Sequence, residues 1–421
     1  MLTGINYFEM NKKEKRSKTF RIARTFLSVL LCTLSLTPHY SYGTQLSPSV
    51  RVSLITYGPG SDDISSAFGH TEIRFVDTEL GIDRNYSYGG FNHHAKGFIL
   101  KFLQGTLRYY LAVHSLADAL PYYQQSNRSI TEQILNLSHA QSQQLFDALE
   151  KNYLLQNRNY QYKFYYDNCA TRPRDMIAAV CGDSLEIPTK SEMTGKSYRD
   201  WMNEYLEDKP WYQLGMNVAI GHPSDQQLNG WNAMYLPDQL SAQLENATVT
   251  QPNGRKIPFV KNKQALFPSV KANPGYRSWT SEPNGVFTIL ALLLVGFTIA
   301  RYVYNKKADR WLDLTLFGVS GLAGWLLLFL WVIRDDDVTS WNPVLLYLMP
   351  LHLPFIFLVC RRRTSRSILK MYFGLTATLI VTGMLLSKIP GWFDLFYPLI
   401  LLARCWVNVL VIKPGKMLSG R

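Results

Sequence analysis

The central part of this 421-residue sequence lacks the excess of basic residues that marks a nucleic-acid-binding surface. The formal net charge of the whole chain is +13. Residues 1–43 carry +5 of this charge and residues 284–421 carry +9, which leaves −1 for residues 44–283. The positive charge is therefore concentrated at the two ends of the chain, and we expect no nucleic-acid partner.

Cysteine is also scarce, and only Cys169 and Cys181 lie between residues 44 and 283. A disulfide between them is one possibility in an oxidising compartment. If the segment between them is one helix, its rise of 1.5 Å per residue separates the two by about 18 Å, which is beyond disulfide reach. Cys169 is then a free thiol. No internal repeat is evident, and we expect no metal and no cofactor.

Long apolar runs are confined to the last third of the chain. Each is close to the roughly 20 residues that a helix needs to cross a hydrocarbon core of about 30 Å. The runs are Val286–Tyr304, Leu314–Ile333, Val344–Cys360, Met371–Leu386 and Trp392–Val411. We therefore expect a linker over residues 267–285, a five-helix transmembrane domain over residues 286–412, and a cytoplasmic tail over residues 413–421.

The first 43 residues have the order of a secretory signal peptide, with a basic run, the apolar segment Phe26–Leu36, and small residues near Gly43. An uncleaved anchor is the alternative. Basic residues follow the first, third and fifth apolar runs, whereas the loop after the second run is acidic. Because Lys and Arg stay on the cytoplasmic side, residues 44–283 lie outside. The sequence predicts a multi-pass protein of the bacterial inner membrane with a periplasmic domain.

The predicted periplasmic domain begins with short runs of β-branched and aromatic residues, which favour strands. They are Val50–Tyr57, Thr71–Val76, Arg84–Tyr88, Leu107–Val113 and Ile130–Leu137. A helix pattern follows, and Ser138 and Gln141 have the spacing of a capping box at its start. The domain is therefore predicted to be α+β.

Cys169 and His70 are the candidate catalytic pair. Asx and Thr residues precede the apolar segment Met176–Val180, which places Cys169 at a helix start, where the helix dipole favours a thiolate. His70 enters a predicted strand and would be well held to accept the thiol proton. His93 and His94 are rival bases, but they lie in a probable loop.

Several short motifs accompany this pair. They are Gly69-His70-Thr71, Tyr88-Gly89-x-Phe91, Phe102-x-x-Gly105-x-Leu107, Asn157-Arg158-x-Tyr160 and the highly specific segment Asp167–Asp175. Together they resemble the N-terminal periplasmic domain of the Lnb family. The resemblance covers about residues 50–245, and the apolar runs look like the membrane domain of that family. It implies a papain-like fold over residues 44–266, permuted so that His precedes Cys, followed by an all-α five-helix transmembrane domain.

The chain departs from the family pattern at Ser87, where Asn is often found, and at the acidic run Asp335–Asp337, where a pattern containing His is expected. The first departure leaves the polar third member of the site open. Glu72 shares a strand face with His70, and Asn85 lies on the next strand, so either is a candidate.

The resemblance implies a lipoprotein N-acyltransferase. Cys169 would take a fatty acyl group from a phospholipid as a thioester, and the amine of a diacylglyceryl-cysteine on an apolipoprotein would receive it. Arg172 and Arg174 are candidates to hold a lipid phosphate. One alternative is a periplasmic cysteine peptidase or amidase acting on cell-wall peptide, because a fold alone does not choose the reaction. The other is a membrane scaffold without enzymatic activity.

Two charged residues, Asp394 and Arg404, lie in the last apolar run, where charge is costly. They are ten residues apart and too distant to pair directly on a regular helix. They are candidates to contact lipid headgroups, and snorkelling toward opposite membrane surfaces is the alternative.

Overall fold

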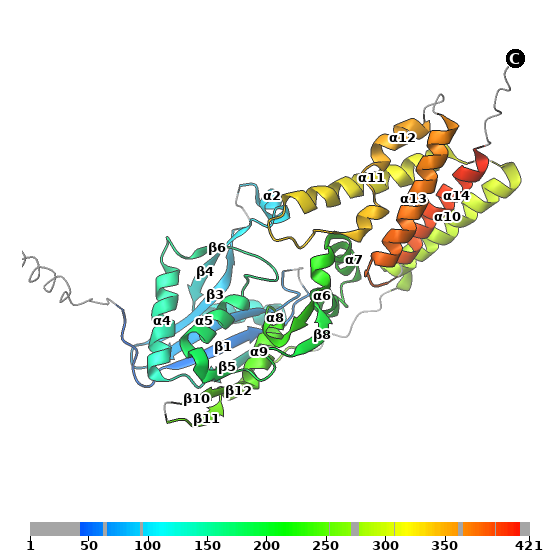
Figure 1. Ribbon diagram of the computed structural model, residues 1–421. Coiled ribbons are helices and arrows are strands. Elements are labelled where there is room, and N and C mark those ends of the chain that lie inside the picture. Colours follow the sequence, from blue (N-terminus) through cyan, green and yellow to red (C-terminus); the bar gives the residue numbers. More distant parts are fainter. Residues whose placement is uncertain are drawn as a thin grey trace, which may run out of the picture. The chain divides into compact units, whose positions relative to one another are not determined.

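The computed structural model describes residues 43–61, 65–92, 96–251, 253–270, 278–306, 308–360, 365–391 and 393–412. Residues 1–42 of the predicted signal peptide, His93, His94, the basic residues Arg361–Arg363 and the predicted cytoplasmic tail lie outside the described residues. In the part described, a mixed α and β domain is followed by a helical region, as the sequence predicts (Figure 1).

A seven-stranded antiparallel sheet organises the first domain, with the strand order β12-β5-β1-β2-β3-β4-β6. Its strands are β1 (Arg51–Tyr57), β2 (His70–Asp77), β3 (Ile82–Phe91), β4 (Arg108–His114), β5 (Ile130–Leu135), β6 (Asn159–Gln161) and β12 (Val260–Phe267). Five of these strands coincide with the runs predicted from residue type. The edge strands β6 and β12 were not predicted, because β6 is short and β12 is mostly exposed.

Helices cover both faces of this sheet. The helices of the first domain are α2 (Phe98–Leu103), α3 (Leu116–Gln125), α4 (His139–Tyr153), α5 (Thr171–Cys181), α6 (Tyr198–Tyr205), α7 (Pro210–Ala219), α8 (Gly230–Ala233) and α9 (Pro237–Glu245), of which α3, α4, α5 and α9 contact the sheet. The main core joins one sheet face to α4 and α5, through residues such as Phe75, Phe146 and Ile177. A smaller cluster on the other face joins Tyr57 to Tyr123 of α3.

The predicted capping box is present at the start of α4, where Ser138 and Gln141 each bond the backbone N–H of the other. The short strands β7 (Leu185–Glu186), β8 (Met193–Ser197), β9 (Gln227–Asn229), β10 (Thr248–Thr250) and β11 (Lys256–Pro258) form two small sheets. Both Cys169 and Cys181 are free, as the helix between them predicts.

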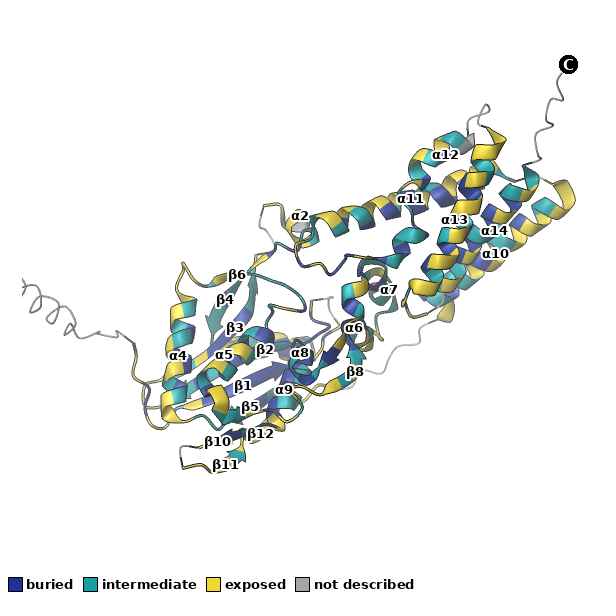
Figure 2. Cartoon of the chain, viewed as in Figure 1, coloured by how far each residue is buried: buried dark blue, intermediate teal, exposed yellow. Residues whose placement is uncertain are grey.

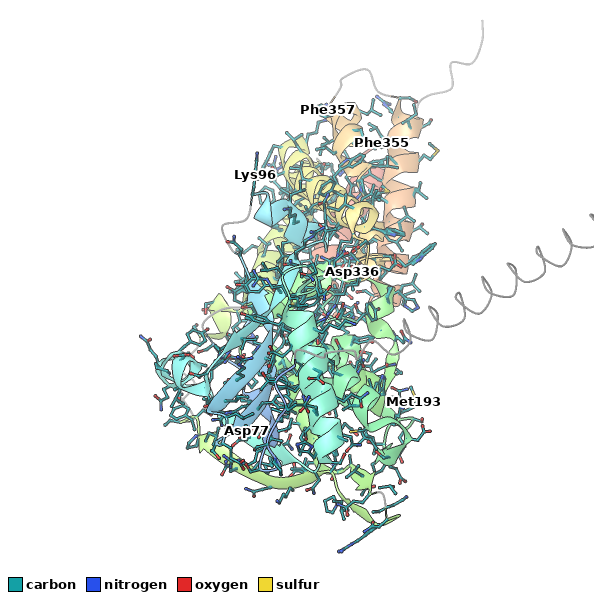
Figure 3. The ribbon with its side chains drawn as sticks, turned by 90° about the vertical axis from the view of Figure 1, so that its left-hand side faces the viewer. Asp77, Lys96, Met193, Asp336, Phe355 and Phe357 are labelled. Atoms are coloured by element: carbon teal, nitrogen blue, oxygen red, sulfur yellow. The ribbon has the colours of Figure 1, made fainter. Side chains whose placement is uncertain are left out.

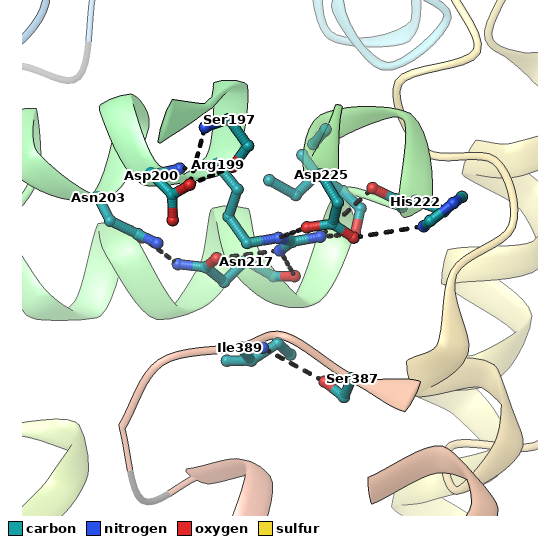
Figure 4. A network of polar contacts seen from close by, with 12 residues as sticks. Ser197, Arg199, Asp200, Asn203, Asn217, His222, Asp225, Ser387 and Ile389 are labelled. Carbon is teal, nitrogen blue, oxygen red and sulfur yellow. Dashed lines mark hydrogen bonds and ion pairs between the residues drawn. The ribbon is translucent and has the colours of Figure 1, made fainter. Parts of the chain in front are cut away.

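A buried ion pair fixes the segment after β8 (Figure 4). Arg199 of α6 bonds Asp225 at 2.7 Å, and it also donates to the backbone and side chain of Asn217 on α7. Asp225 belongs to the short 3₁₀ turn η2 (His222–Asp225). Because Arg199 is almost fully buried, these partners replace the water that its guanidinium would otherwise need.

Four helices of the C-terminal region are long and apolar enough to cross a membrane. They are α10 (Pro283–Asn305), α11 (Arg310–Ile333), α13 (Arg366–Leu386) and α14 (Phe393–Val411). Leu292 and Leu385 are among their exposed leucines. Figure 2 shows exposed residues along the outer sides of these helices. Apolar surface of this kind is stable in lipid but not in water. The chain is thus a membrane protein.

The third predicted span, Val344–Cys360, is not one continuous helix. The segment forms a 3₁₀ turn, η4 (Pro343–Leu346), and then the nine-residue helix α12 (His352–Cys360). Pro350 explains the break, because it lacks a backbone N–H and disfavours helical backbone at Met349. The five-helix count is therefore not confirmed.

The irregular backbone of this segment is buried against α11. A Cβ at Gly324 would lie 1.7 Å from the carbonyl oxygen of Leu348, so only glycine permits the approach. His352 bonds the carbonyl of Tyr347 and the hydroxyl of Tyr372. Non-helical backbone is tolerated at membrane depth where protein covers it in this way.

Arg404 does not snorkel toward a membrane surface. It is fully buried, and it bonds Asp313 of α11 at 2.7 Å and the hydroxyl of Thr298 on α10. Asn408 donates to the second oxygen of Asp313. Asp394 accepts a hydrogen bond from Tyr347 instead of reaching a lipid headgroup. The sequence did not reveal either pairing, because each joins two distant segments.

The loop over residues 334–342, between α11 and η4, is built into the first domain. Val338 is buried in a cluster that contains Phe68 and Tyr165. Its carbonyl accepts a hydrogen bond from the N–H of Gly221 at 2.8 Å. A Cβ at Gly221 would lie 1.7 Å from the carbonyl oxygen of Ser340. The periplasmic core is thus completed by a loop that belongs to the membrane region.

Arg404→Met should destabilise the helical region, because it leaves Asp313 as a buried charge without its cationic partner. Breaking a buried pair in this way costs about 3–5 kcal/mol. Thermal unfolding in detergent measures the effect, with Arg310→Met as the control, since Arg310 is exposed. Adding Asp313→Leu to Arg404→Met should recover much of the loss. An unchanged midpoint in the single variant would show that the pair contributes nothing.

Candidate active site

His70 is the first residue of β2, and glycines lie before it in the chain and beneath its ring. Gly69 has a φ of +76°, a left-handed conformation that favours glycine. A Cβ at Gly89 of the neighbouring strand β3 would lie 2.6 Å from Cε1 of His70. The imidazole therefore rests directly on the Gly89 backbone, where β3 also has a bulge.

Three side chains surround the imidazole of His70. Its Nε2 lies 2.8 Å from Oγ of Ser87 and 3.5 Å from Oε1 of Glu72. The side chain of Cys169 is within hydrogen-bonding reach of the ring. Ser87 and Glu72 both engage Nε2 of the ring. The structure thus brings together the two residues that the sequence predicts as a pair.

The charge of these neighbours decides the protonation of His70. Burial opposes its charged form, but the neighbouring Cys169 side chain and the Glu72 carboxylate outweigh burial and raise the pKa of His70 to about 10. An imidazolium opposite a thiolate is the form of a Cys–His pair that is ready for nucleophilic attack.

Glu72 is a buried carboxylate with several donors around it. Its Oε2 accepts from the hydroxyl of Tyr57 at 2.8 Å and from Nδ2 of Asn85 at 2.9 Å. Its Oε1 lies 3.1 Å from Nε2 of His114. Burial favours its neutral form, but His114 and His70 outweigh burial and hold the pKa of Glu72 far below the usual range. Glu72 therefore remains ionised.

His114, at the end of β4, is the member of this network that the sequence did not single out. Its hydrogen bond to Glu72 raises its pKa to about 9, against the opposing effect of burial. Asn85 contacts Glu72 and not His70, so it can act only by holding the carboxylate. Ser87, which the sequence treats as a departure from the family, occupies the position beside Nε2 of His70.

The loop before α5 holds Cys169 through the side chain of Asn168. Its Oδ1 accepts from the backbone N–H groups of Ala170 and Thr171, and its Nδ2 donates to the carbonyls of Phe164 and Tyr235. The first amides of α5 are thus already bonded. We conclude that His70, more than unpaired helix amides, supplies the positive charge opposite the thiol.

Arg172 and Arg174 both have partners within the domain. Arg172 binds Asp167 with two hydrogen bonds and lies 3.8 Å from the ring centroid of Tyr160. Arg174 bonds Asp175 and lies over the ring of Trp231. These contacts order the segment that carries Cys169. Phosphate binding by either arginine remains a prediction.

A row of aromatic rings leads to Cys169. Tyr109 stacks on Phe91 at 4.8 Å and on Tyr162 at 4.2 Å between ring centroids. Tyr109 also lies 6.2 Å from Tyr160 between ring centroids, and the guanidinium of Arg172, three residues after Cys169, lies over the Tyr160 ring. The candidate active site is therefore apolar on the side of β4 and β6 and charged on the side of Glu72.

No group of three metal-ligating side chains suited to a metal ion is found among the described residues. The site consists of a thiol, an imidazole beside it, and an ionised carboxylate behind the imidazole. These parts can form a covalent intermediate with a carbonyl compound and can carry one proton between the reacting groups.

Glu72→Gln should lower the pKa of His70, because it removes the negative charge that favours the imidazolium. The alkaline limb of the pH–rate profile should then move to lower pH by at least about one unit. Glu132→Gln is the matched control. Glu132 is also buried, and it lies opposite Ile55 of β1 on strand β5, just as Glu72 does on strand β2. Its ion pair, however, is with Arg74 and not with His70. If the alkaline limb of the pH–rate profile does not move in Glu72→Gln, Glu72 does not control the protonation of His70.

Comparisons with known proteins agree with the two-part organisation of the chain. The family model of the Lnb N-terminal periplasmic domain matches residues 37–206. The family model of the Lnb transmembrane domain matches residues 276–415. No curated protein and no solved structure matches the chain, so the permuted papain-like fold stays a prediction. The two matches together span about three quarters of the sequence, and the chain belongs to the Lnb family, with a periplasmic domain followed by a transmembrane domain.

Proposed function

We propose that this protein is a lipoprotein N-acyltransferase of the bacterial inner membrane. It would move a fatty acyl group from a phospholipid to the N-terminal amine of a diacylglyceryl-cysteine lipoprotein. The observation that carries the proposal is the contact between His70 and Cys169 in a domain whose core is completed by a loop of the membrane region. Membership of the Lnb family supports an enzyme that modifies lipoproteins.

The first half-reaction makes a thioester. The thiolate of Cys169 attacks the ester carbonyl of the donor phospholipid, and an S–C bond forms. The ester C–O bond then breaks, and the lysophospholipid leaves as an alcohol that takes its proton from the His70 imidazolium. Cys169 now carries the acyl group, and His70 is neutral.

The second half-reaction transfers the acyl group to nitrogen. The amine of the lipoprotein attacks the thioester carbonyl, and the C–S bond breaks as the amide C–N bond forms. His70 accepts the proton that the amine loses, which restores the thiolate–imidazolium pair. Water would divert the thioester to a free fatty acid, so the site must exclude it. Tyr109 and Tyr162 provide apolar cover for this purpose.

In this proposal Cys169 and His70 are the catalytic residues, and Glu72 is a positioning residue that also keeps His70 protonated. Ser87 and Asn85 hold the imidazole and the carboxylate respectively. Arg172 and Arg174 are proposed to meet the lipid phosphate only if a substrate displaces their present contacts.

Cys169→Ser should leave the fold and membrane insertion intact and abolish acyl transfer, because an unactivated hydroxyl is a far weaker nucleophile than a thiolate. His70→Ala should lower the rate by more than about 100-fold. Both rates are measured with the purified full-length chain in lipid, and circular dichroism checks the fold. Comparable turnover by Cys169→Ser would exclude Cys169 as the nucleophile.

The proposal is tested against the alternative, a cysteine hydrolase of cell-wall peptide, by a comparison of two substrates. The full-length chain is given a diacylated lipopeptide with phospholipid, and separately a cell-wall peptide. The full chain is needed, because a fragment ending at residue 283 would lose Val338 from its core. We expect an N-acylated lipopeptide and an intact cell-wall peptide. Cleavage of the cell-wall peptide without acylation of the lipopeptide would contradict the acyltransferase proposal and support the hydrolase.

A further inference from the structure

The helix α2 and the helix α7 both lie at the periplasmic ends of membrane helices. Trp211 of α7 donates from Nε1 to the carbonyl of Ser281, two residues before α10 begins. The chain just after α2 comes close to the end of α11. A Cβ at Gly105 would lie 3.2 Å from Nη2 of Arg334, the residue that follows α11. Gln161 and Lys163 also contact Asp335 in the same loop.

These two helices expose large apolar side chains at that level. Leu100 and Phe102 of α2 are 50% and 56% exposed, and Trp211 and Tyr212 of α7 are 50% and 53% exposed. Trp341, beside η4, is 71% exposed and packs against Trp331 of α11. We call these five residues the apolar rim. Aromatic side chains at the ends of membrane helices are typical of the lipid headgroup region.

The charge around α2 fits the same surroundings. Residues 96–108 contain Lys96, Lys101 and Arg108 and no acidic residue, and all three cations are exposed. A short segment that combines exposed apolar side chains with Lys and Arg binds a lipid surface, and anionic headgroups strengthen the contact. Figure 3 shows Lys96 and Asp336 far from Asp77, which marks the opposite end of the sheet.

The catalytic end of the sheet is the end that carries α2. The chain leaves β3 at Phe91, forms α2, and returns in β4, where Phe91 pairs with Tyr109. Gly89, which contacts the His70 ring, lies two residues before Phe91. The stacked rings of Phe91, Tyr109 and Tyr162 then lead from the base of α2 toward the segment that carries Cys169. Tyr109 also lies near Tyr160, and Arg172, three residues after Cys169, lies over the Tyr160 ring.

We infer that the apolar rim rests in the headgroup region of the periplasmic leaflet, and that α2 takes up the phospholipid whose acyl chain reaches Cys169 along Phe91, Tyr109 and Tyr162. The contact between the apolar rim and lipid does not depend on the proposed function. The delivery of the acyl donor by α2 does rest on the proposed function. The occupant of this surface is the bilayer, because the rim continues the surface of the membrane helices.

Photo-crosslinking in the full-length chain tests the lipid contact. Benzoylphenylalanine is placed at Leu100, and at Leu80 as the matched control, in bilayers of phosphatidylethanolamine and phosphatidylglycerol. Leu80 is 46% exposed, and its N–H bonds Asp77 at the far end of the sheet. Mass spectrometry should find a phospholipid adduct at Leu100 and none at Leu80. No adduct at Leu100, or equal adducts at both positions, would overturn the inference.

The double variant Leu100→Ser and Phe102→Ser tests the delivery of the donor. Removing two apolar side chains from a lipid contact should lower acyl transfer from bilayer phospholipid by at least about tenfold. Leu80→Ser should transfer at the wild-type rate, and thermal unfolding should be the same for both variants. Unchanged transfer by the double variant would refute delivery by α2. If the wild type transfers no acyl group, the proposed function is wrong. The photo-crosslinking result at Leu100 then tests the lipid contact by itself.

Discussion

The candidate active site depends on the interactions of the buried carboxylate of Glu72. A carboxylate without partners at such a position would be protonated, because burial disfavours its charge. His114 and His70 keep it ionised, and Tyr57 and Asn85 donate further hydrogen bonds to it. Cys169 and the ionised Glu72 in turn keep His70 protonated. The strands β1, β2, β3 and β4 each contribute one of these groups or the ring itself. The geometry of the sheet is therefore also the electrostatic basis of the site.

The membrane region contributes more than an anchor. Val338 lies in the same cluster as Phe68, two residues before His70, and as Tyr165, four residues before Cys169. A change in the position of the loop over residues 334–342 would thus alter the packing of both segments that carry the candidate catalytic pair. The glycine at position 221 and the buried pair of Arg404 and Asp313 serve the same end, because they fix that loop and the helices that hold it.

Much of this organisation could be predicted from the sequence, where the signal is local. Short runs of β-branched and aromatic residues predicted the five main strands, and the capping box predicted the start of α4. The pair of Cys169 and His70 was predicted from the residues around each, and the structure places them together. The roles of Ser87 and His114 were not predicted, because they follow from the register of β2, β3 and β4. The break at Pro350 was missed because hydropathy counts apolar residues and ignores a missing backbone donor.

The central claim is that Cys169 carries the acyl group between donor and acceptor, and trapping the intermediate tests it most directly. The full-length chain is mixed with phospholipid in the absence of lipopeptide, quenched with acid and digested. Mass spectrometry should find a fatty acyl group on the peptide that contains Cys169, and hydroxylamine should remove it. Adding diacylated lipopeptide before the quench should discharge it. An acyl group on another residue, or an unmodified Cys169 under conditions where the lipopeptide is acylated, would contradict the account.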